Sequence, residues 1–333
     1  MPATQPRFLV EAIEDAIEAS GHSALPISLE RQHPRKFIVS SPDGNQILLW
    51  VYAWTLTHGG RPSLPREYRI QMTSVASPLN LNPQGPTILI GYEPSLKLFA
   101  GFDLKRHSTF TTGSPSVQID IDVLHTALQH GLAFGRKAND EVAIGIRPDQ
   151  FMDYVHTANE LHACGRKVNT FRLLSKASAL APISEQELEA LPTQRKRIIQ
   201  TVTRLSRKAN FHQQVLAAYG NRCAVTRMQL RLVEAAHILP VGAPGSADDV
   251  RNGIALSPTY HRAYDTGLIY LDENHAMRVN PEKESGLLQL RLEGGLAEFK
   301  ATLGKIHLPP DQRQHPDLKF IRKANRYRQI ARD

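Results

Sequence analysis

Hydrophobic and polar positions follow two different periods along the first half of the chain. Apolar residues recur at helical spacing over residues 8–20 and predict an amphipathic helix that ends at Gly21. Within residues 36–56, the β-rich runs FIVS and ILLWVYAWTL flank SPDGN, and an Asp-Gly turn between such runs predicts a hairpin. A second hairpin is predicted over residues 87–103, where TILIGY and LKLFAGFD flank EPS.

The same patterns predict the remaining elements of this first block. We expect a strand over 67–74, a helix over 123–132, a strand over 141–146 and a helix that begins at Pro148 and continues through residue 162. Strands joined by hairpins and followed by helices indicate an α+β fold with a mostly antiparallel sheet. We assign this mixed α/β block to an N-terminal domain, residues 1–165.

The next segment changes character. Residues 163–193 lack strand signals and carry two prolines, which favours a connector with a short helix over 184–190. Residues 194–210 hold six basic residues and no acid, and Arg197, Arg204 and Lys208 recur at helical spacing. Such a face suits a phosphate backbone, although a solvated basic helix has the same pattern. We therefore expect a linker with a basic helix over 166–205.

The last block, residues 206–333, is expected to form a second domain. Short strands are predicted over 277–280 and 287–292, and the basic tail from residue 319 onward is a helix candidate. No internal repeat or low-complexity segment interrupts either block.

Composition and charge narrow the class of protein. The 333 residues include 40 Lys and Arg against 32 Asp and Glu, and the net charge of +8 moderately favours a polyanionic partner. Two cysteines exclude a disulfide framework and favour a reducing cytoplasm. Residues 1–21 mix acids with apolar residues and predict no signal peptide, and no apolar run approaches the ~20 residues of a membrane span.

The chemistry concentrates between residues 223 and 272. His237 ends a short apolar run, and Asn252 follows fifteen residues later, just before a glycine. His261 and Asp265 stand four positions apart, so on a helix they share a face and suit a divalent cation. A third imidazole opposite that cation would take a proton from water, which is a layout for metal-assisted hydrolysis.

The residues in this stretch resemble a known family. Ala-Ala-His-Ile, Asn-Gly-Ile-Ala-Leu and Tyr-His-Arg-Ala-Tyr-Asp-Thr-Gly-Leu are similar to the signature of HNH endonucleases. The resemblance covers residues 206–333 and implies the ββα-metal fold, with His237 as general base. It implies that Asn252 braces the loop of the base or reaches the metal, and that His261 and Asp265 bind the ion. We thus expect His237, Asn252 and His261 in catalysis.

Two departures from the family pattern affect the expected metal chemistry. Ala236 occupies the position before the base, where many relatives place a metal ligand, so the ion would depend on His261 and Asp265. Oxygen donors there favour Mg²⁺, with Mn²⁺ as an alternative. Glu234, Asp248 and Asp249 are possible helpers, the last two more simply as loop caps. Cys223 begins Cys-Ala-Val-Thr instead of CxxC, so we expect no structural zinc.

The first block contains candidate residues for recognition. WVYAWTLTHGGRP and EYRIQM are similar to a module that precedes HNH domains in restriction-type proteins. Trp50, Tyr52 and Trp54 alternate onto one strand face, either as core packing or as an aromatic pocket for a base. Arg61 and Arg69 in this block and Arg262 in the HNH motif join the basic helix residues as expected DNA contacts.

The combined prediction is a metal-dependent DNA endonuclease of restriction type. The N-terminal domain would select the site on double-stranded DNA, the HNH domain would cut, and two copies would be needed for both strands, which favours a homodimer. One alternative is a nuclease that depends on modified bases. The other is a DNA-binding protein with a decayed nuclease site, for which Ala236 is the support.

Overall fold

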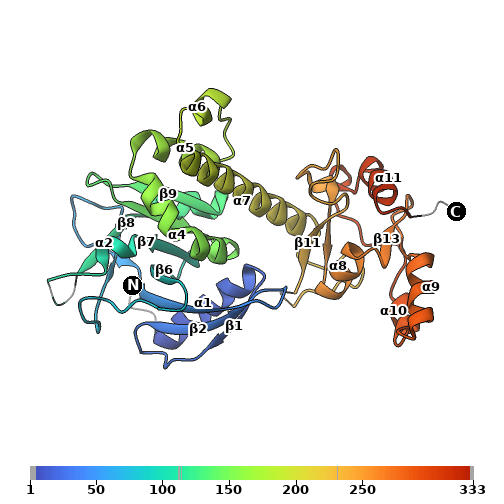
Figure 1. Cartoon of the computed structure of the whole chain (residues 1–333), viewed down its shortest axis with the longest axis horizontal. Coiled ribbons are helices and arrows are strands. Elements are labelled where there is room, and N and C mark those ends of the chain that lie inside the picture. The colour runs from blue at the N-terminus through green and yellow to red at the C-terminus, as the bar shows by residue number, and fades with distance from the viewer. Residues whose placement is uncertain (1–4, 112, 114, 231, 331–333) are drawn as a thin grey trace. The chain divides into compact units, whose positions relative to one another are not determined.

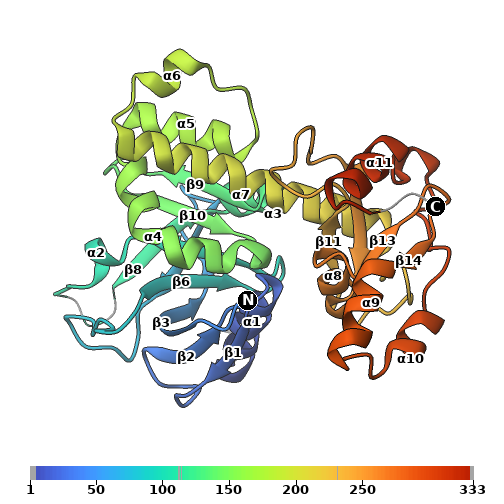
Figure 2. The same cartoon turned by 45° about the vertical axis from the view of Figure 1, so that its right-hand side comes forward.

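The computed structural model describes residues 5–111, 113, 115–230 and 232–330. The chain divides into two compact units, Met1–Ala209 and Asn210–Asp333. The boundary falls inside one long helix, α7 (Thr193–Ala218), which is visible in both overall views (Figure 1, Figure 2). In the described part of the chain, no helix is long and apolar enough to cross a membrane.

The first unit is built around a mixed sheet. Among the described residues the strand order is β1-β2-β3-β6-β7-β10-β9. These strands are β1 (Ser23–Pro26), β2 (Arg35–Ser40), β3 (Gln46–Thr55), β6 (Thr87–Glu93), β7 (Leu98–Phe102), β9 (Leu132–Arg136) and β10 (Val142–Ile146). Both predicted hairpins are confirmed, because β2 pairs antiparallel with β3, and β6 with β7. The two hairpins join through β3 and β6, which run parallel.

Strand β3 shows how the sheet separates two cores. Val51 and Ala53 belong to a core that also contains residues of α1 (Pro6–Ala19), α4 (Phe151–Gly165) and α7. Tyr52 and Trp54 belong to a different core. Alternate side chains of a strand point to opposite faces, so a period of two divides the apolar residues between the two cores.

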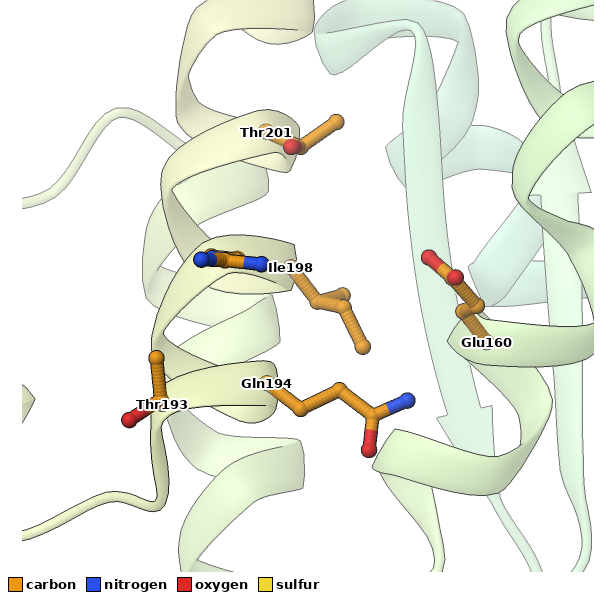
Figure 3. Close-up of a pocket in the computed structure, with 6 residues that line it drawn as sticks. Glu160, Thr193, Gln194, Ile198 and Thr201 are labelled. Carbon is orange, nitrogen blue, oxygen red and sulfur yellow. The ribbon is translucent and has the colours of Figure 1, made fainter.

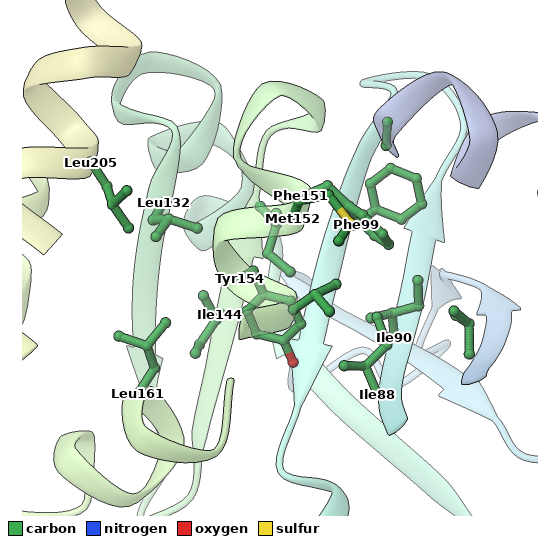
Figure 4. Close-up of a cluster of buried hydrophobic side chains, with 14 of the residues drawn as sticks. Ile88, Ile90, Phe99, Leu132, Ile144, Phe151, Met152, Tyr154, Leu161 and Leu205 are labelled. Carbon is green, nitrogen blue, oxygen red and sulfur yellow. The ribbon is translucent and has the colours of Figure 1, made fainter. Parts of the chain in front are cut away.

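The core on the helical side is large and apolar (Figure 4). Ile88 and Ile90 of β6 and Ile144 of β10 lie close to Phe151 and Tyr154 of α4. Each fully buried side chain of this size contributes about 1.5–3 kcal/mol relative to exposure, so this layer is a major source of stability for the unit.

The opposite face of the sheet is covered by a smaller sheet and a helix. The smaller sheet has the order β4-β5-β8, with β4 (Thr57–His58), β5 (Glu67–Gln71) and β8 (Ser116–Asp120), and α3 (Ile121–His130) follows directly. The strand predicted over 67–74 is therefore present as β5, outside the main sheet. The predicted helix over 123–132 is confirmed as α3, and the predicted strand over 141–146 as β10. A short helix, α2 (Leu104–His107), follows β7.

Residues 166–205, expected as a linker, supply core residues of the first unit. Leu173 and Leu174 come from α5 (Val168–Ser178), and Ile198 and Ile199 from α7. The periodic leucines of α5 need a partner surface, and the sheet provides it. The predicted short helix is confirmed as α6 (Glu185–Glu189), where Ser184 and Glu187 form a capping box.

The second unit has its own core and smaller sheets. It contains β11 (Glu234–His237), β12 (Gly253–Leu256), α8 (Pro258–Asp265), β13 (Ile269–Leu271), β14 (Met277–Val279), α9 (Pro281–Leu290), α10 (Leu296–Ala301) and α11 (Leu318–Tyr327). The predicted strand near residues 277–280 and the predicted terminal helix are confirmed as β14 and α11. The tail beyond residue 330 lies outside the described residues.

The predicted strand over 287–292 is wrong, because that segment ends helix α9. Its alternating leucines have the pattern of a strand, but the residues that start the helix lie before this segment. The Asn280 side chain accepts from the Glu282 amide at 3.1 Å, and Pro281 occupies the first turn. An N-cap followed by proline fixes a helix start.

Two of the three aromatic residues on β3 are packed into the core. Tyr52 donates to the Asn80 carbonyl at 3.0 Å, and the Trp54 indole donates to the Thr73 carbonyl at 3.3 Å. His33 stacks on Trp54 with 4.3 Å between ring centroids. Burial, assisted by the nearby Arg35 charge, lowers the pKa of His33 to about 3. Trp50 is half-buried and lies 4.4 Å from the Lys36 ammonium.

We expect His33 to make the first unit sensitive to acid. Its pKa is about 3 in the fold against about 6.5 in the unfolded chain, so the unfolded state takes up a proton first as pH falls. Stability is therefore lost between roughly pH 6.5 and pH 3. His33→Phe keeps the stacked ring and removes the titration. Thermal unfolding of both proteins from pH 7 to pH 4 should show a smaller drop in Tm for the variant, and equal drops would contradict the assignment.

Candidate nuclease site

The candidate site is assembled within the second unit from β11, β12 and α8. β11 and β12 pair antiparallel, which places His237 at the end of β11 opposite Gly253. A Cβ at residue 253 would come 2.2 Å from Val215 of α7, so only glycine allows this strand to pack against the helix. In the Asn-Gly pair seen in the sequence, Asn252 thus supplies a buried side-chain amide, and Gly253 allows the backbone to lie close to Val215.

His237 is held on two sides. Its Nε2 lies 3.0 Å from Asp248 Oδ1, and because a carboxylate only accepts, the ring nitrogen carries the proton. The ring stacks on Phe211 of α7, with 3.8 Å between centroids and 12° between planes. Burial lowers the pKa of His237, and the Asp248 carboxylate only partly offsets that effect. The imidazole is therefore neutral near pH 7, with its Nδ1 lone pair available.

Asn252 is fully buried and fixes the loop that follows His237. Its Oδ1 accepts from the Leu239 amide at 2.8 Å, and its Nδ2 donates to the Ala247 carbonyl at 2.9 Å and to the Leu239 carbonyl at 3.2 Å. Of the two roles left open by the sequence, the geometry fits bracing the loop. The carbonyl oxygen of the side chain is already used by the protein, which does not favour a contact with metal.

His261 and Asp265 lie on α8, one turn apart as the spacing predicts. His261 Nε2 is 3.3 Å from Asp265 Oδ2, and its Nδ1 is 2.5 Å from Glu234 Oε2 at the start of β11. Burial acts to lower the pKa of His261, but Glu234 and Asp265 together outweigh it, and the pKa is raised. An imidazole between two carboxylates is a site that attracts positive charge.

The two histidines and Asp265 share one electrostatic environment. β11 carries both His237 and Glu234, and Glu234 bonds to His261, which lies beside Asp265 on α8. Within the described ranges, no cluster of three or more His, Cys, Asp or Glu side chains has a geometry able to hold a metal ion. The predicted ligands, His261 and Asp265, are one imidazole and one carboxylate placed side by side on α8, and both are donor types that divalent ions accept.

Three side chains complete the site beyond the residues expected to act. Glu234 was a possible helper without a defined role, and it bonds to His261. Asp248 was expected more simply as a loop cap, and it bonds to His237. Phe211 was missed, because nothing in its helical segment distinguishes it from a core residue. Asp249 caps the 3-10 turn η2 (Val250–Asn252) by accepting from the Arg251 amide at 2.9 Å, which confirms its expected capping role.

Cys223 is buried in the same unit and is held by its own turn. Burial acts to raise the pKa of the thiol, but hydrogen bonds from the Thr226 side chain and from nearby backbone amides outweigh it, and the pKa is lowered. Thr226 stands where a CxxC pair would place a second sulfur. The turn is therefore closed by a hydroxyl and backbone amides.

The expected DNA contacts differ in their availability. Arg197, Arg204 and Lys208 on α7 and Arg262 on α8 are exposed. Arg61 is held by Glu67 in an ion pair, and Arg69 is half-buried on β5. The strongest candidates are therefore the helical cations.

A pocket in the first unit includes one of these cations, Arg197. It has a volume of about 490 Å³ and is lined by Glu160 of α4 and by Thr193, Gln194, Arg197, Ile198 and Thr201 of α7. Figure 3 shows Gln194 and Ile198 directed toward the side of Glu160. The pocket contains none of the residues of the HNH motif.

Two parts of the chain match known families. Residues 223–272 match the HNH endonuclease family, and residues 47–155 match the family described as Methylase-associated X1. His237, Asn252, His261 and Asp265 all lie in the first match. The second unit is therefore an HNH endonuclease domain, as its motif predicts, and the protein is a nuclease.

The particular arrangement in this chain joins that domain to an N-terminal Methylase-associated X1 domain. The combination identifies a restriction-type nuclease, and the α+β class predicted for both domains is confirmed. HNH nucleases generally use a divalent metal ion. Among solved structures, the chain is similar to the "Modification dependent TagI restriction endonuclease", with 12% identity, a TM-score of 0.29 and coverage of 87% of this chain and 84% of that chain. No curated protein matches.

We expect Asn252→Ala to destabilise the second unit strongly. The substitution leaves the Leu239 amide and the Ala247 carbonyl without their partner in a fully buried position. Unsatisfied buried groups of this kind cost about 1–3 kcal/mol each, so the free energy of unfolding should fall by about 2–4 kcal/mol. Urea unfolding measures the change. Asn274→Ala, at an exposed position of the same unit, is the control, and equal effects would exclude a bracing role.

Proposed function

We propose that the protein is a metal-dependent restriction endonuclease that hydrolyses phosphodiester bonds in double-stranded DNA. The observation that carries the proposal is that β11 carries both His237 and the Glu234 carboxylate, which holds His261 beside Asp265 on α8. Phosphodiester hydrolysis needs a base for water, positive charge for the phosphate and a proton for the leaving oxygen. In this site His237 would supply the base. A divalent ion held by His261 and Asp265 would supply the positive charge and the proton of a bound water.

His237 would act as the general base. Asp248 accepts from Nε2–H, so the lone pair of Nδ1 is left to take a proton from water. Phe211 prevents the ring from tilting, and Asn252 fixes the backbone that carries it. As the imidazole gains a proton, the nearby carboxylate stabilises the resulting charge.

His261 and Asp265 would hold the divalent ion, with Mg²⁺ the preferred ion and Mn²⁺ an alternative because a carboxylate contributes to the site. When bound, the ion supplies charge neutralisation for the phosphate and an acidic water for the leaving oxygen. Glu234 keeps the His261 ring in place by accepting from Nδ1, which leaves Nε2 beside Asp265.

The N-terminal domain would select the target. The exposed cations of α7 and Arg262 would contact phosphates, with Arg69 and the paired Arg61 as weaker candidates. Double-strand cleavage by one site per chain would require two copies, hence a homodimer. A cytoplasmic location agrees with the reduced cysteines, both of which are free and buried.

A modification-dependent nuclease is the second candidate. Trp50 favours it, since this ring on β3 is half-buried beside Lys36, outside the buried cores that hold Tyr52 and Trp54. The partly exposed face of this ring, beside a cation, would stack on a nucleobase taken out of the DNA helix. The modified nucleobase would be recognised by the first unit, and the second unit would hydrolyse the phosphodiester bond as described above.

We expect His237→Gln to lose cleavage without losing DNA affinity. Removal of a general base typically costs about 10²–10⁴-fold in rate. Nicking of supercoiled DNA with Mg²⁺ measures the rate, and a filter or fluorescence assay measures affinity. His307→Gln, an exposed position of the same unit, should cleave normally. No cleavage of any DNA by the wild-type protein with Mg²⁺ or Mn²⁺ would support a decayed site instead.

Cleavage of matched methylated and unmethylated genomic DNA should distinguish the two candidates. A nuclease that recognises unmodified sites should cut the unmethylated sample, whereas one that depends on modification should cut only the methylated sample. For the second outcome we expect Trp50→Ala to abolish the preference while His237 still supports residual cutting. Sequencing of the cut ends identifies the site in either case, and equal random cutting of both samples would contradict target selection by the first unit.

A further inference from the structure

Helix α11 presents a basic face that the proposed mechanism does not use. Its ten residues include the cations Lys319, Arg322, Lys323 and Arg326 and no acid. Its other face carries Phe320, Ile321 and Ala324 into the core of the second unit. The helix is therefore fixed on its apolar side, and its charges are directed to solvent.

The helix is attached to the loop between β11 and β12, which surrounds the candidate site. At its N-terminal end the Asp317 amide donates to the Arg251 carbonyl at 3.0 Å. Just beyond its C-terminal end, Arg328 Nη1 donates to the carbonyl of Ile238 at 2.9 Å. Ile238 directly follows His237, and Arg251 directly precedes Asn252.

The middle of α11 lies against the same loop. A Cβ placed on Gly245 would come 2.6 Å from the Lys323 ammonium, so this charge sits over the loop that contains Asp248. Lys319, Lys323 and Arg326 are spaced at i, i+4 and i+7 and therefore share one helix face. All three are exposed or nearly so, with Lys319 also bonded to the Asp317 carboxylate.

The negative charge around the histidines would be offset by a basic surface such as the exposed face of α11. Glu234, Asp248 and Asp265 bond to the two histidines, and each would repel an approaching phosphate. Cations held at the rim offset that repulsion at distances comparable with the Debye length of about 8–10 Å. Arg322 contributes less, because it is bonded to Glu273 at 2.7 Å.

We propose that Lys323 and Arg326 of α11 bind the phosphate backbone of the DNA substrate beside the bond that is cut. This inference rests on the proposed function and adds a second DNA surface, distinct from α7 and α8. Ammonium and guanidinium groups on an exposed helix face contact phosphates without reading bases, so the contribution is independent of sequence. It holds the duplex at the rim of the loop that follows His237.

The test compares the salt dependence of DNA affinity in the full-length protein. The background is His237→Gln, so that no DNA is cut, and the probe is a fixed duplex between 50 and 300 mM NaCl. Each phosphate contact contributes about 0.9 to the slope of log K against log salt. Lys323→Ala with Arg326→Ala should lower the slope by about 1.8 and weaken binding by about 10–100-fold near 0.1 M salt.

The matched control is Lys283→Ala with Arg291→Ala, which removes one exposed cation from α9 and one from the residue that follows it in the same unit. It should leave affinity and slope close to those of the unchanged background. An α11 variant with an unchanged slope would overturn the proposal, whether or not its affinity falls. With His237 intact, the α11 variant should still cut at saturating concentration, whereas the absence of cutting by the wild-type protein would instead contradict the nuclease function.

Discussion

The site depends on the buried amide of Asn252. Its backbone carbonyl accepts from the Ile238 amide at 2.8 Å, and its side chain binds Leu239 and Ala247. The residue after His237 and the loop that carries Asp248 are therefore tied to one point. Gly253 then lets β12 lie against α7. Without these bonds, neither the backbone of the base nor its carboxylate partner would have a fixed position, and no local propensity would restore them.

Much of the fold was predictable because its signals are local. The Asp-Gly turn between β2 and β3, the capping box at Ser184 and the periodicity of α3 each lie within a few residues. The parallel pairing of β3 with β6 was not predictable, since the hydrophobic pattern of one strand does not indicate which distant strand it will pair with. The strand predicted over 287–292 was wrong although its signal was local. The N-cap at Asn280 starts a helix, and this helix includes the alternating leucines.

The same distinction applies to the site. His237, Asn252, His261 and Asp265 were found through identities and spacings that a helix or a short strand converts directly into geometry. Asp248 and Glu234 were visible only as nearby acids, because a loop and a strand end determine which histidine each one meets. Phe211 could not be found, since its stacking on His237 joins residues 26 positions apart.

The acids that organise the histidines also make the site unfavourable for its proposed substrate. Asp248 and Glu234 hold the two rings by hydrogen bonds, so neither side chain can be removed without loss of the geometry. A polyanion therefore approaches such a centre only where bound cation and surrounding basic residues reverse the local potential. For DNA binding, the size of the net charge of +8 matters less than its distribution. Exposed cations lie on α7, α8 and α11. Rigid positioning of the base and attraction of DNA thus depend on different residues and need not change together.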